Sequence, residues 1–378
     1  MNQRKVIIVG AGIGGLVLAH SLHQKRISFE IYDRFPAHLT NSDGWAITLH
    51  SALAHLRNLL PGAQAALERI SVCAGSGHSD QFAFYQGSPG KILSCGTTDT
   101  LDFVRANRHR LLEWLGHGVN INWGCTYLRH EIDNDTGRVT VIFTNGTSTQ
   151  GHVLVGCDGL DSRVRNMLYY PIPAPLSTLP TRCIGGSVIL DPTQYARQST
   201  LSRSLYITYA QDCRLLVGLN TYAQGMAFAE YHWLLCFPAD ADSEIWERGA
   251  TSERQLAFAR NAVQGMEYDL CEVIYLTKPE KMFTPFLVRD RVPEILPDGA
   301  GPVTLIGDAA HPMSFFKGDG GNAAVEDAVR LAEYLHLVGA SSSSCERALR
   351  LFEEEMVARV APMVLQARQA TSINVQAA

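Results

Sequence analysis

The stretch "KVIIVGAGIGGLVLAHSLHQKRISFEIYDR", residues 5–34, decides the fold of this chain. The apolar run at 5–9 predicts a buried strand, and the segment that follows the glycines predicts a helix to about Gln24. A second apolar run then ends on Asp33. Between the first strand and the helix stands the spacing Gly-x-Gly-x-x-Gly, so this stretch predicts the first β-α-β unit of a parallel sheet.

The three glycines of this fingerprint have separate physical tasks. Gly10 permits a tight turn, Gly12 lets a pyrophosphate approach the backbone, and Gly15 lets the helix pack closely on the strand. The helix N-terminus then directs its partial positive charge at the phosphates. Asp33 is placed to accept hydrogen bonds from ribose hydroxyls. A purely structural strand-turn-helix is the alternative, and the acid at this distance favours a dinucleotide site, although the motif does not separate FAD from NAD.

Composition sets the limits of the possible function. The 378 residues suggest about two domains, and 46% hydrophobic with 18% charged residues is typical of a globular protein. A formal charge of -5 without a basic run disfavours a nucleic-acid surface. The nine cysteines form no C-x-x-C pair, which favours reduced thiols and a cytoplasmic protein without a metal site. We expect no membrane span, because no apolar stretch approaches ~20 residues.

The middle of the chain carries two kinds of pattern. Residues 101–116 predict a strand end and then a helix, and for Arg105 a solvated position at the helix start is the first reading. Residues 138–168 predict a strand that turns at Asn145-Gly146 and returns as a second strand, "HVLVG". This second strand ends at Cys157-Asp158-Gly159, where an open α/β sheet places ligand groups. From about 172 to 285 the alternating segments predict a mostly antiparallel sheet, with a partly helical insertion at 242–262.

A third motif, "LIGDAAHPMSFFKGDGGN", occupies residues 305–322. An apolar strand ends on Gly307-Asp308, and a loop with three further glycines leads into an amphipathic helix at 322–338. Backbone N–H groups and the positive end of a helix dipole therefore converge on this loop. The serine run at 341–344 predicts a flexible connection between helices.

Together, the glycine fingerprint, "GCDGLDSRVR" at 156–165 and "GDAAHPMSFFKGDGGN" at 307–322 resemble the single-component FAD-dependent aromatic hydroxylases. These are the class A flavoprotein monooxygenases with the p-hydroxybenzoate hydroxylase fold, and the resemblance is to those of secondary metabolism. It covers nearly the whole chain. The implied fold is α/β: a discontinuous Rossmann-like FAD-binding domain (residues 1–72, 100–171 and 285–378), a β-sheet-rich substrate domain (73–99 and 172–284) and a C-terminal helix.

The resemblance implies a role for each matched position. Asp33 and its neighbour Arg34 would lie at the adenosine ribose, Asp158 near the dinucleotide, and Asp308 on the ribityl chain. Arg105 resembles the family arginine that contacts the cofactor, which weakens the solvated reading. The full set of implied cofactor residues is Gly10, Gly12, Ile13, Gly14, Gly15, Asp33, Arg34, Arg105, Asp158, Gly307, Asp308, Gly318, Gly320, Gly321 and Asn322.

The implied function is an FAD-dependent monooxygenase that uses NAD(P)H and O2 to hydroxylate or epoxidise an aromatic or polycyclic small molecule through a flavin 4a-hydroperoxide. NAD(P)H would be a transient reductant, because a second glycine fingerprint is missing. The alternative is a non-oxygenating dehydrogenase, reductase or cyclising oxidase of the same fold. A non-enzymatic dinucleotide sensor is a third reading, in which the later motifs would be superfluous.

The substrate side is less clearly marked in the sequence. The candidates for substrate contact are Trp45, His50, Tyr206, Tyr222 and Phe315, and none of them, nor His232, is identified as the catalytic base. His311 is expected to be structural. Two residues depart from the family pattern: Phe315 stands where a proline is common, and Asp319 adds an acid that would oppose an anionic reduced flavin unless it turns away.

Overall fold

The computed structural model describes residues 4–36, 45–88, 90–98, 102–172, 174–210, 212–223, 228–239, 250–339 and 341–371. Its first sheet has five parallel strands in the order β17-β11-β1-β2-β7. The strands are β1 (Lys5–Val9), β2 (Ser28–Tyr32), β7 (Ile121–Asn122), β11 (Val153–Gly156) and β17 (Val303–Leu305). The strand-helix-strand unit predicted from residues 5–34 is therefore confirmed at the centre of this sheet.

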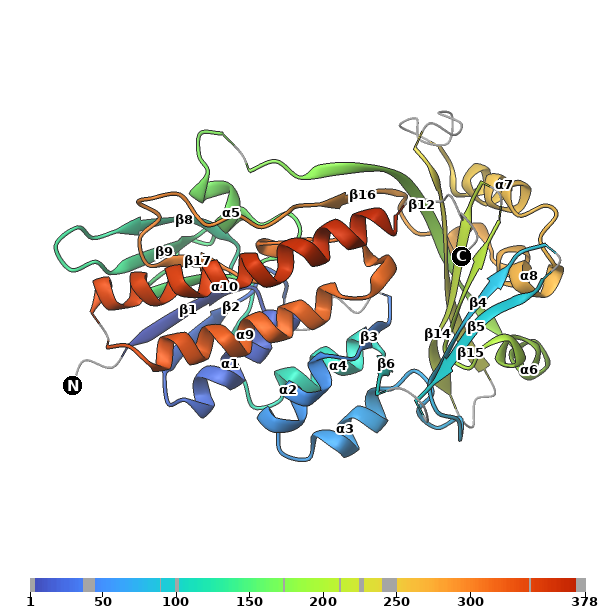
Figure 1. The fold of residues 1–378 in the computed structure, drawn as a ribbon, viewed down its shortest axis with the longest axis horizontal. Coiled ribbons are helices and arrows are strands. Elements are labelled where there is room, and N and C mark those ends of the chain that lie inside the picture. Colours follow the sequence, from blue (N-terminus) through green and yellow to red (C-terminus); the bar gives the residue numbers. More distant parts are fainter. Residues whose placement is uncertain are drawn as a thin grey trace.

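Helices from both ends of the chain pack beside this sheet. The helix α1 (Ile13–Gln24) contacts α9 (Gly320–His336), and α9 lies along α10 (Ser342–Gln369), as Figure 1 shows. Shorter elements surround them: α2 (Ala52–Leu59), α3 (Ala63–Ile70), α4 (Arg108–Gly116), α5 (Arg163–Leu168) and the antiparallel pair β3 (Ile47–Leu49) and β6 (Val104–Ala106). A three-stranded sheet is built from β8 (Tyr127–Ile132), β9 (Val139–Phe143) and β10 (Ser148–Gly151). The strand that returns from the Asn145-Gly146 turn is therefore β10, and the predicted return strand forms β11 of the parallel sheet instead.

The second large sheet has seven strands in the order β16-β12-β15-β14-β13-β4-β5. Its strands are β4 (Gln81–Gln86), β5 (Ile92–Thr97), β12 (Ser177–Leu190), β13 (Leu205–Tyr209), β14 (Arg214–Ala223), β15 (Phe228–Pro238) and β16 (Phe286–Asp290). All its pairings are antiparallel except β13 with β4. Its outer face is covered by α6 (Pro192–Leu201), α7 (Ser252–Ala262) and α8 (Tyr268–Leu276), seen at the right of Figure 1.

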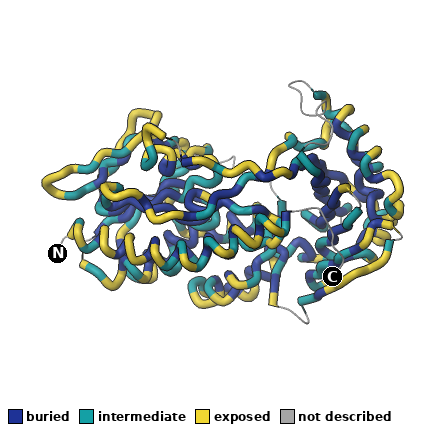
Figure 2. Tube along the Cα trace, turned by 45° about the horizontal axis from the view of Figure 1, so that its top comes forward, coloured by how far each residue is buried: buried dark blue, intermediate teal, exposed yellow. Residues whose placement is uncertain are grey.

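Apolar burial supports both halves of the molecule. One core cluster joins the parallel sheet to α1, α9 and α10, and another joins the seven-stranded sheet to its outer helices. Figure 2 shows the interior of both halves buried, with exposed residues on the outer loops and helix faces. The mixed α/β architecture with a separate antiparallel-rich sheet and a C-terminal helix agrees with the predicted fold class.

Three details qualify the sequence predictions. The serine run does not form a flexible connection: Ser341 caps α10 by accepting a hydrogen bond from the N–H of Ser344, because a serine side chain satisfies a free donor at a helix start. Residues 242–249 of the predicted insertion lie outside the described residues. The division into domains stays a prediction, and β16, which follows residue 284, pairs with β12 of the substrate sheet.

Within the described residues, no helix is long and apolar enough to cross a membrane. No group of three or more histidine, cysteine, aspartate or glutamate side chains in this part of the chain could hold a metal ion.

Candidate active site

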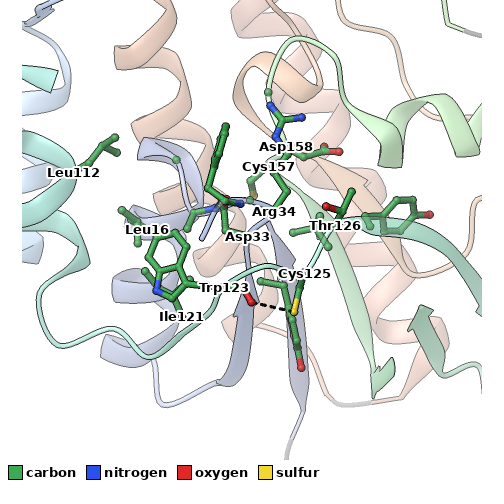
Figure 3. A pocket seen from close by; sticks show the side chains of 18 of the residues that line it. Leu16, Asp33, Arg34, Leu112, Ile121, Trp123, Cys125, Thr126, Cys157 and Asp158 are labelled. Carbon is green, nitrogen blue, oxygen red and sulfur yellow. Dashed lines mark hydrogen bonds between the residues drawn. The ribbon is translucent and has the colours of Figure 1, made fainter. Parts of the chain in front are cut away.

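A cavity of about 490 Å³ lies at the carboxyl ends of β1, β2 and β11. Figure 3 shows it from close by, with Asp33 and Arg34 from the end of β2 and Cys157 and Asp158 from the end of β11. Trp123 and Ile121 form a part of its apolar wall. This is the position at which open parallel sheets bind their ligands.

The glycines of the fingerprint give the cavity its shape. Gly10 has φ +109°, and a Cβ atom there would lie 2.3 Å from the carbonyl oxygen of Cys157. A Cβ atom on Gly15 would lie 2.0 Å from the carbonyl oxygen of Gly10, so the helix packs directly on the turn. Gly12 instead lines the cavity, and a Cβ atom there would meet no atom within 4 Å. The open space beside Gly12 fits a phosphate group close to the backbone.

The fixed carboxylate of Asp33 also lines this cavity. Its Oδ2 accepts a hydrogen bond from the N–H of Ala11 at 2.7 Å, and its Oδ1 accepts one from the N–H of Phe35 at 2.9 Å. Each carboxylate oxygen has a further lone pair for a ribose hydroxyl. Arg34 is exposed at the rim, with its guanidinium 5.1 Å from the centre of the Phe35 ring.

The Asp158 carboxylate accepts several hydrogen bonds from the protein itself. They come from Ser162 Oγ at 2.5 Å and from the N–H groups of Arg163 at 2.7 Å and Val164 at 3.2 Å. Burial raises the pKa of this carboxyl, and these hydrogen bonds offset part of the effect. Asp158 therefore fixes the β11-α5 turn at the cavity wall, and a cofactor contact uses its remaining lone pairs.

Asp308 is the residue that lines both this cavity and a second one. Its carboxylate accepts no hydrogen bond from any described residue, and its Oδ1 lies 3.9 Å from the position of a Cβ atom on Gly320. The side chain is exposed to the cavities, and the protein atoms packed around it raise its pKa by desolvation. The positive charges of His311, Arg108 and Arg165 offset part of that rise. The Asp308 carboxylate can therefore accept hydrogen bonds from the hydroxyl groups of a ligand, such as those of the ribityl chain of FAD.

The sequence analysis missed Arg108, the first residue of α4, which lines the first cavity. Burial lowers the pKa of its guanidinium, and the nearby charge of Asp308 opposes that effect. Arg105 lies three positions earlier and lines the second cavity instead. Both arginines stand in the same short segment of the sequence, and the predicted strand and helix do not indicate which of them lines the dinucleotide cavity. Arg108 is therefore a further candidate for the cofactor.

A buried ion pair anchors the turn that carries Asp308. His311 Nε2 lies 2.6 Å from Asp327 Oδ2, and neither side chain is exposed. Asp327 also accepts hydrogen bonds from the N–H of Gly307 at 2.9 Å and from Arg359 Nη2 at 2.9 Å. Burial alone lowers the pKa of His311, but the Asp327 carboxylate raises it above its ordinary value. His311 is structural, as expected, while Asp327 on α9 was not anticipated.

Asn322 has a different role from the one predicted. Its Oδ1 accepts hydrogen bonds from the N–H groups of His50 at 2.9 Å and Ala52 at 3.1 Å. Its Nδ2 donates to the carbonyl oxygens of Thr48 and Gly318, both at 2.9 Å. All four hydrogen-bonding positions of this buried amide are used within the protein. The Asn322 side chain thus holds the glycine loop (residues 312–322) to β3 and has no hydrogen-bonding position left for the cofactor.

The other predicted cofactor glycines divide between the cavity and the interior. Gly318, Gly320 and Gly321 line the second cavity. Ile13 and Gly14, by contrast, face the interior: Ile13 packs on the core, and Gly14 faces α9. Gly307, with φ +59°, is also buried, and a Cβ atom there would lie 3.0 Å from Ala324. These three residues shape the backbone and contribute no side chain to either cavity.

The second cavity, of about 660 Å³, lies between the glycine loop and the inner face of the seven-stranded sheet. Its wall is largely aromatic and aliphatic. Trp45, His50 and Phe315 line it, as predicted for substrate contacts. Its other residues include Phe82, Phe84, Phe103, Ile207, Leu216, Leu234, Phe286 and Phe316.

Two of the predicted substrate residues lie elsewhere. Tyr206 alternates along β13 with the cavity residues Leu205 and Ile207, so it points to the opposite face and donates its buried hydroxyl to Gln198. Tyr222 also faces the outer helices, with its ring 5.0 Å from that of Tyr195. The prediction of substrate contact is therefore wrong for Tyr206 and Tyr222.

Asp319, the unusual acid of the glycine loop, turns away from the cavity and pairs with His50. Its Oδ1 lies 3.4 Å from His50 Nε2, and only 16% of its side chain is exposed. It lines neither cavity. Because Asp319 lines neither cavity, it would oppose an anionic flavin less than an acid in the cavity wall would.

The two cavities share Asp308 in their walls and define the class of protein: a dinucleotide site at a parallel sheet beside a largely apolar cavity for a small molecule. The fit to FAD rests on the open space at Gly12, the unpartnered Asp308 carboxylate and the glycine loop at the N-terminus of α9. That is the architecture of a class A flavoprotein monooxygenase.

Comparison with known proteins gives the same result. The model of the FAD binding domain family matches residues 3–366. The chain is 32% identical over 340 residues to FAD-dependent monooxygenase thnD of Trichoderma harzianum, covering 87% of this chain and 82% of that protein. It is 30% identical over 375 residues to 3-amino-4-hydroxybenzoate 2-monooxygenase PtmB3 of Streptomyces platensis, covering 95% and 85%. The structure of Klebsiella pneumoniae HpxO complexed with FAD and uric acid superposes with a TM-score of 0.78 at 22% identity, covering 97% of this chain and 88% of that one.

This chain belongs to the FAD binding domain family, and it is an FAD-dependent monooxygenase. FAD is its cofactor.

Proposed function

We propose that this monooxygenase uses NAD(P)H and O2 to hydroxylate or epoxidise an aromatic or polycyclic small molecule bound in the second cavity. The observation that carries the proposal is the aromatic and aliphatic chamber of about 660 Å³ that meets the dinucleotide cavity at Asp308. A flat apolar ligand in this chamber would lie beside the glycine loop, where the flavin ring is expected.

The protein's own residues have three tasks in this proposal. The Gly12 backbone, Asp33 and Arg108 hold the dinucleotide, and Asp308 holds the ribityl chain. The glycine loop and the N-terminus of α9 present N–H groups to the ring, and a positive dipole end there favours a reduced, negatively charged flavin. The bound FAD supplies the oxygen chemistry by the route that the resemblance implies.

The apolar walls serve to exclude water from the reacting centre. NAD(P)H is proposed as a transient reductant because the sequence holds one glycine fingerprint. The names of two similar proteins support an aromatic or heterocyclic substrate: PtmB3 acts on 3-amino-4-hydroxybenzoate, and HpxO was crystallised with uric acid. A cytoplasmic location remains a prediction from the reduced cysteines.

The test begins with a screen of phenolic and polycyclic compounds for acceleration of NADH and NADPH oxidation by the purified yellow protein. The reaction is then run under ¹⁸O2, and the mass of the product is measured by mass spectrometry. The proposal predicts one labelled oxygen atom in the product of an aromatic compound. A product without oxygen from O2 would instead support the non-oxygenating dehydrogenase, reductase or cyclising oxidase.

A further inference from the structure

We propose that Arg105 binds an anionic oxygen of the substrate, carboxylate or phenolate, inside the second cavity. This inference rests on the proposed function, because it assigns the substrate class of that same cavity. The site of reaction on the ring is a separate question.

The guanidinium of Arg105 is buried and largely unsatisfied. The residue is 6% exposed and lines the second cavity. Its Nε has no hydrogen-bond partner among the described residues, and Nη1 reaches only Thr48 Oγ1, at 3.4 Å. A guanidinium carries five N–H donors, and buried polar groups without partners destabilise a fold. Most of its donors are therefore available to a ligand.

The positive charge of Arg105 is also poorly compensated. Asp80, whose charge opposes the lowering of the Arg105 pKa, accepts hydrogen bonds from the main-chain N–H of Arg105 at 3.1 Å and from Ser71 Oγ at 2.9 Å. Among the described residues, no carboxylate forms a salt bridge with the guanidinium, although Arg57 pairs with Asp102 at the cavity edge at 2.7 Å. Burial lowers the pKa of Arg105 to about 10, so the group remains cationic at neutral pH.

The position of this cation is fixed by backbone on two sides. Arg105 on β6 pairs with Thr48 on β3, which lies against Gly318 of the glycine loop. On the other side, a Cβ atom on Gly218 of β14 would lie 2.7 Å from Nη2. The guanidinium therefore rests on the seven-stranded sheet, the wall that faces the glycine loop. A substrate between sheet and loop would have Arg105 at its edge.

The chemistry of the cavity then selects the ligand. Phe82, Phe84 and Phe103 favour an aromatic body, while Arg105 favours an anionic oxygen. A carboxylate or phenolate would relieve the unpaired buried charge and form charge-assisted hydrogen bonds. Beside the Arg105 cation a bound phenol would lose its proton to water more readily, and the phenolate so formed is more electron-rich than the phenol.

The test measures ligand binding to the FAD-loaded protein by changes in flavin absorbance. The probes are 6-hydroxy-2-naphthoate, its amide 6-hydroxy-2-naphthamide and its methyl ether 6-methoxy-2-naphthoate. The amide lacks the carboxylate and the ether lacks the phenol, so the two arms distinguish the two sources of anionic oxygen. The variants are Arg105→Met, Arg105→Lys and, as a matched control, Arg69→Met, an exposed arginine on α3.

In the wild-type protein and in Arg69→Met, we expect one of the two analogues to bind ~10- to 100-fold more weakly than the hydroxynaphthoate, as a charge-assisted hydrogen bond implies. Arg105→Met should remove that difference while keeping its FAD, and Arg105→Lys should keep a part of it.

Equal binding of the three probes, binding of none, or a preference that survives Arg105→Met would overturn the inference. Loss of FAD from Arg105→Met would also overturn it, since Arg105 would then serve the cofactor. A yellow protein that incorporates labelled oxygen but shows no such preference would leave the proposed function standing and reject this inference alone.

Discussion

Replacing Asp308 with alanine should separate FAD binding from folding. The carboxylate lines both cavities and has no hydrogen-bond donor among the described residues, so the substitution removes no hydrogen bond from that part of the apoprotein. A hydrogen bond to a charged group contributes ~1.5 to 3 kcal/mol, which predicts ~10- to 150-fold weaker FAD binding in Asp308→Ala. Asp308→Asn keeps one acceptor oxygen, so its affinity for FAD should lie between those of the wild type and Asp308→Ala.

The stability of the apoprotein provides the second readout. Burial raises the pKa of Asp308, so the folded state binds a proton more readily than the unfolded state does. Stability therefore falls as pH rises from the ordinary aspartate value through the raised one. Asp308→Ala should lack this contribution and should unfold at the same temperature as the wild type, or higher, at neutral pH.

The assay is titration of apoprotein with FAD, followed by flavin fluorescence, with thermal unfolding of each apoprotein measured alongside. Asp319→Ala is the matched control, because Asp319 belongs to the same loop but pairs with His50 and lines neither cavity. FAD binding by Asp308→Ala within twofold of the wild type would refute the assignment. Equal losses in the two variants would show that the loop, and not the Asp308 carboxylate, holds the cofactor.

Three further predictions concern the frame of the site. Gly12→Ala should fold normally but bind FAD weakly, since its methyl group would enter the cavity. Gly15→Ala should fail to fold, because a backbone oxygen lies 2.0 Å from the Cβ position of that residue. Circular dichroism and FAD titration check both variants, and normal FAD binding by Gly12→Ala would contradict the phosphate site. Tyr206→Phe should lose ~1 kcal/mol of unfolding free energy and leave ligand binding unchanged, so weaker ligand binding at unchanged stability would restore it to the substrate site. The pKa of His311 is raised and that of Asp327 is lowered, so the ion pair stabilises the fold fully from about pH 6.5 down to the acid range in which Asp327 becomes protonated. It is lost as pH rises through the raised pKa of His311. Asp327→Asn should therefore flatten the pH dependence of unfolding above pH 6.5, and an unchanged profile would contradict that role.

The parts of the site that the sequence predicted well are those fixed by backbone chemistry. The spacing of Gly10, Gly12 and Gly15 predicts a turn that the structure confirms: Gly10 and Gly15 have no room for a Cβ atom, and Gly12 borders the open cavity. The strand ends at Asp33 and Asp158 likewise follow from apolar runs that stop at polar residues.

The parts that the sequence did not predict depend on direction in space. Tyr206 and Tyr222 lie on the outer face of their sheet, and the β-bulge between Leu219 and Thr221 changes the alternation on β14. Arg105 and Arg108 are three residues apart but line different cavities, because a strand ends and a helix begins between them.

The sequence also does not show which polar side chains form their hydrogen bonds within the protein rather than with a ligand. Asn322 forms four hydrogen bonds, three to residues about 270 positions away and one to its own loop. No local sequence pattern indicates these partners. The same applies to Asp327, whose three partners come from the Asp308 turn and from α10.

The fate of dioxygen tests the central claim most directly. The compound from the screen that most accelerates NAD(P)H oxidation is incubated with the purified protein under ¹⁸O2, and its product is analysed by mass spectrometry. We expect a product two mass units heavier than the one formed under ¹⁶O2, with the second oxygen atom released as water. A product of the same mass under both gases would contradict monooxygenation at this site.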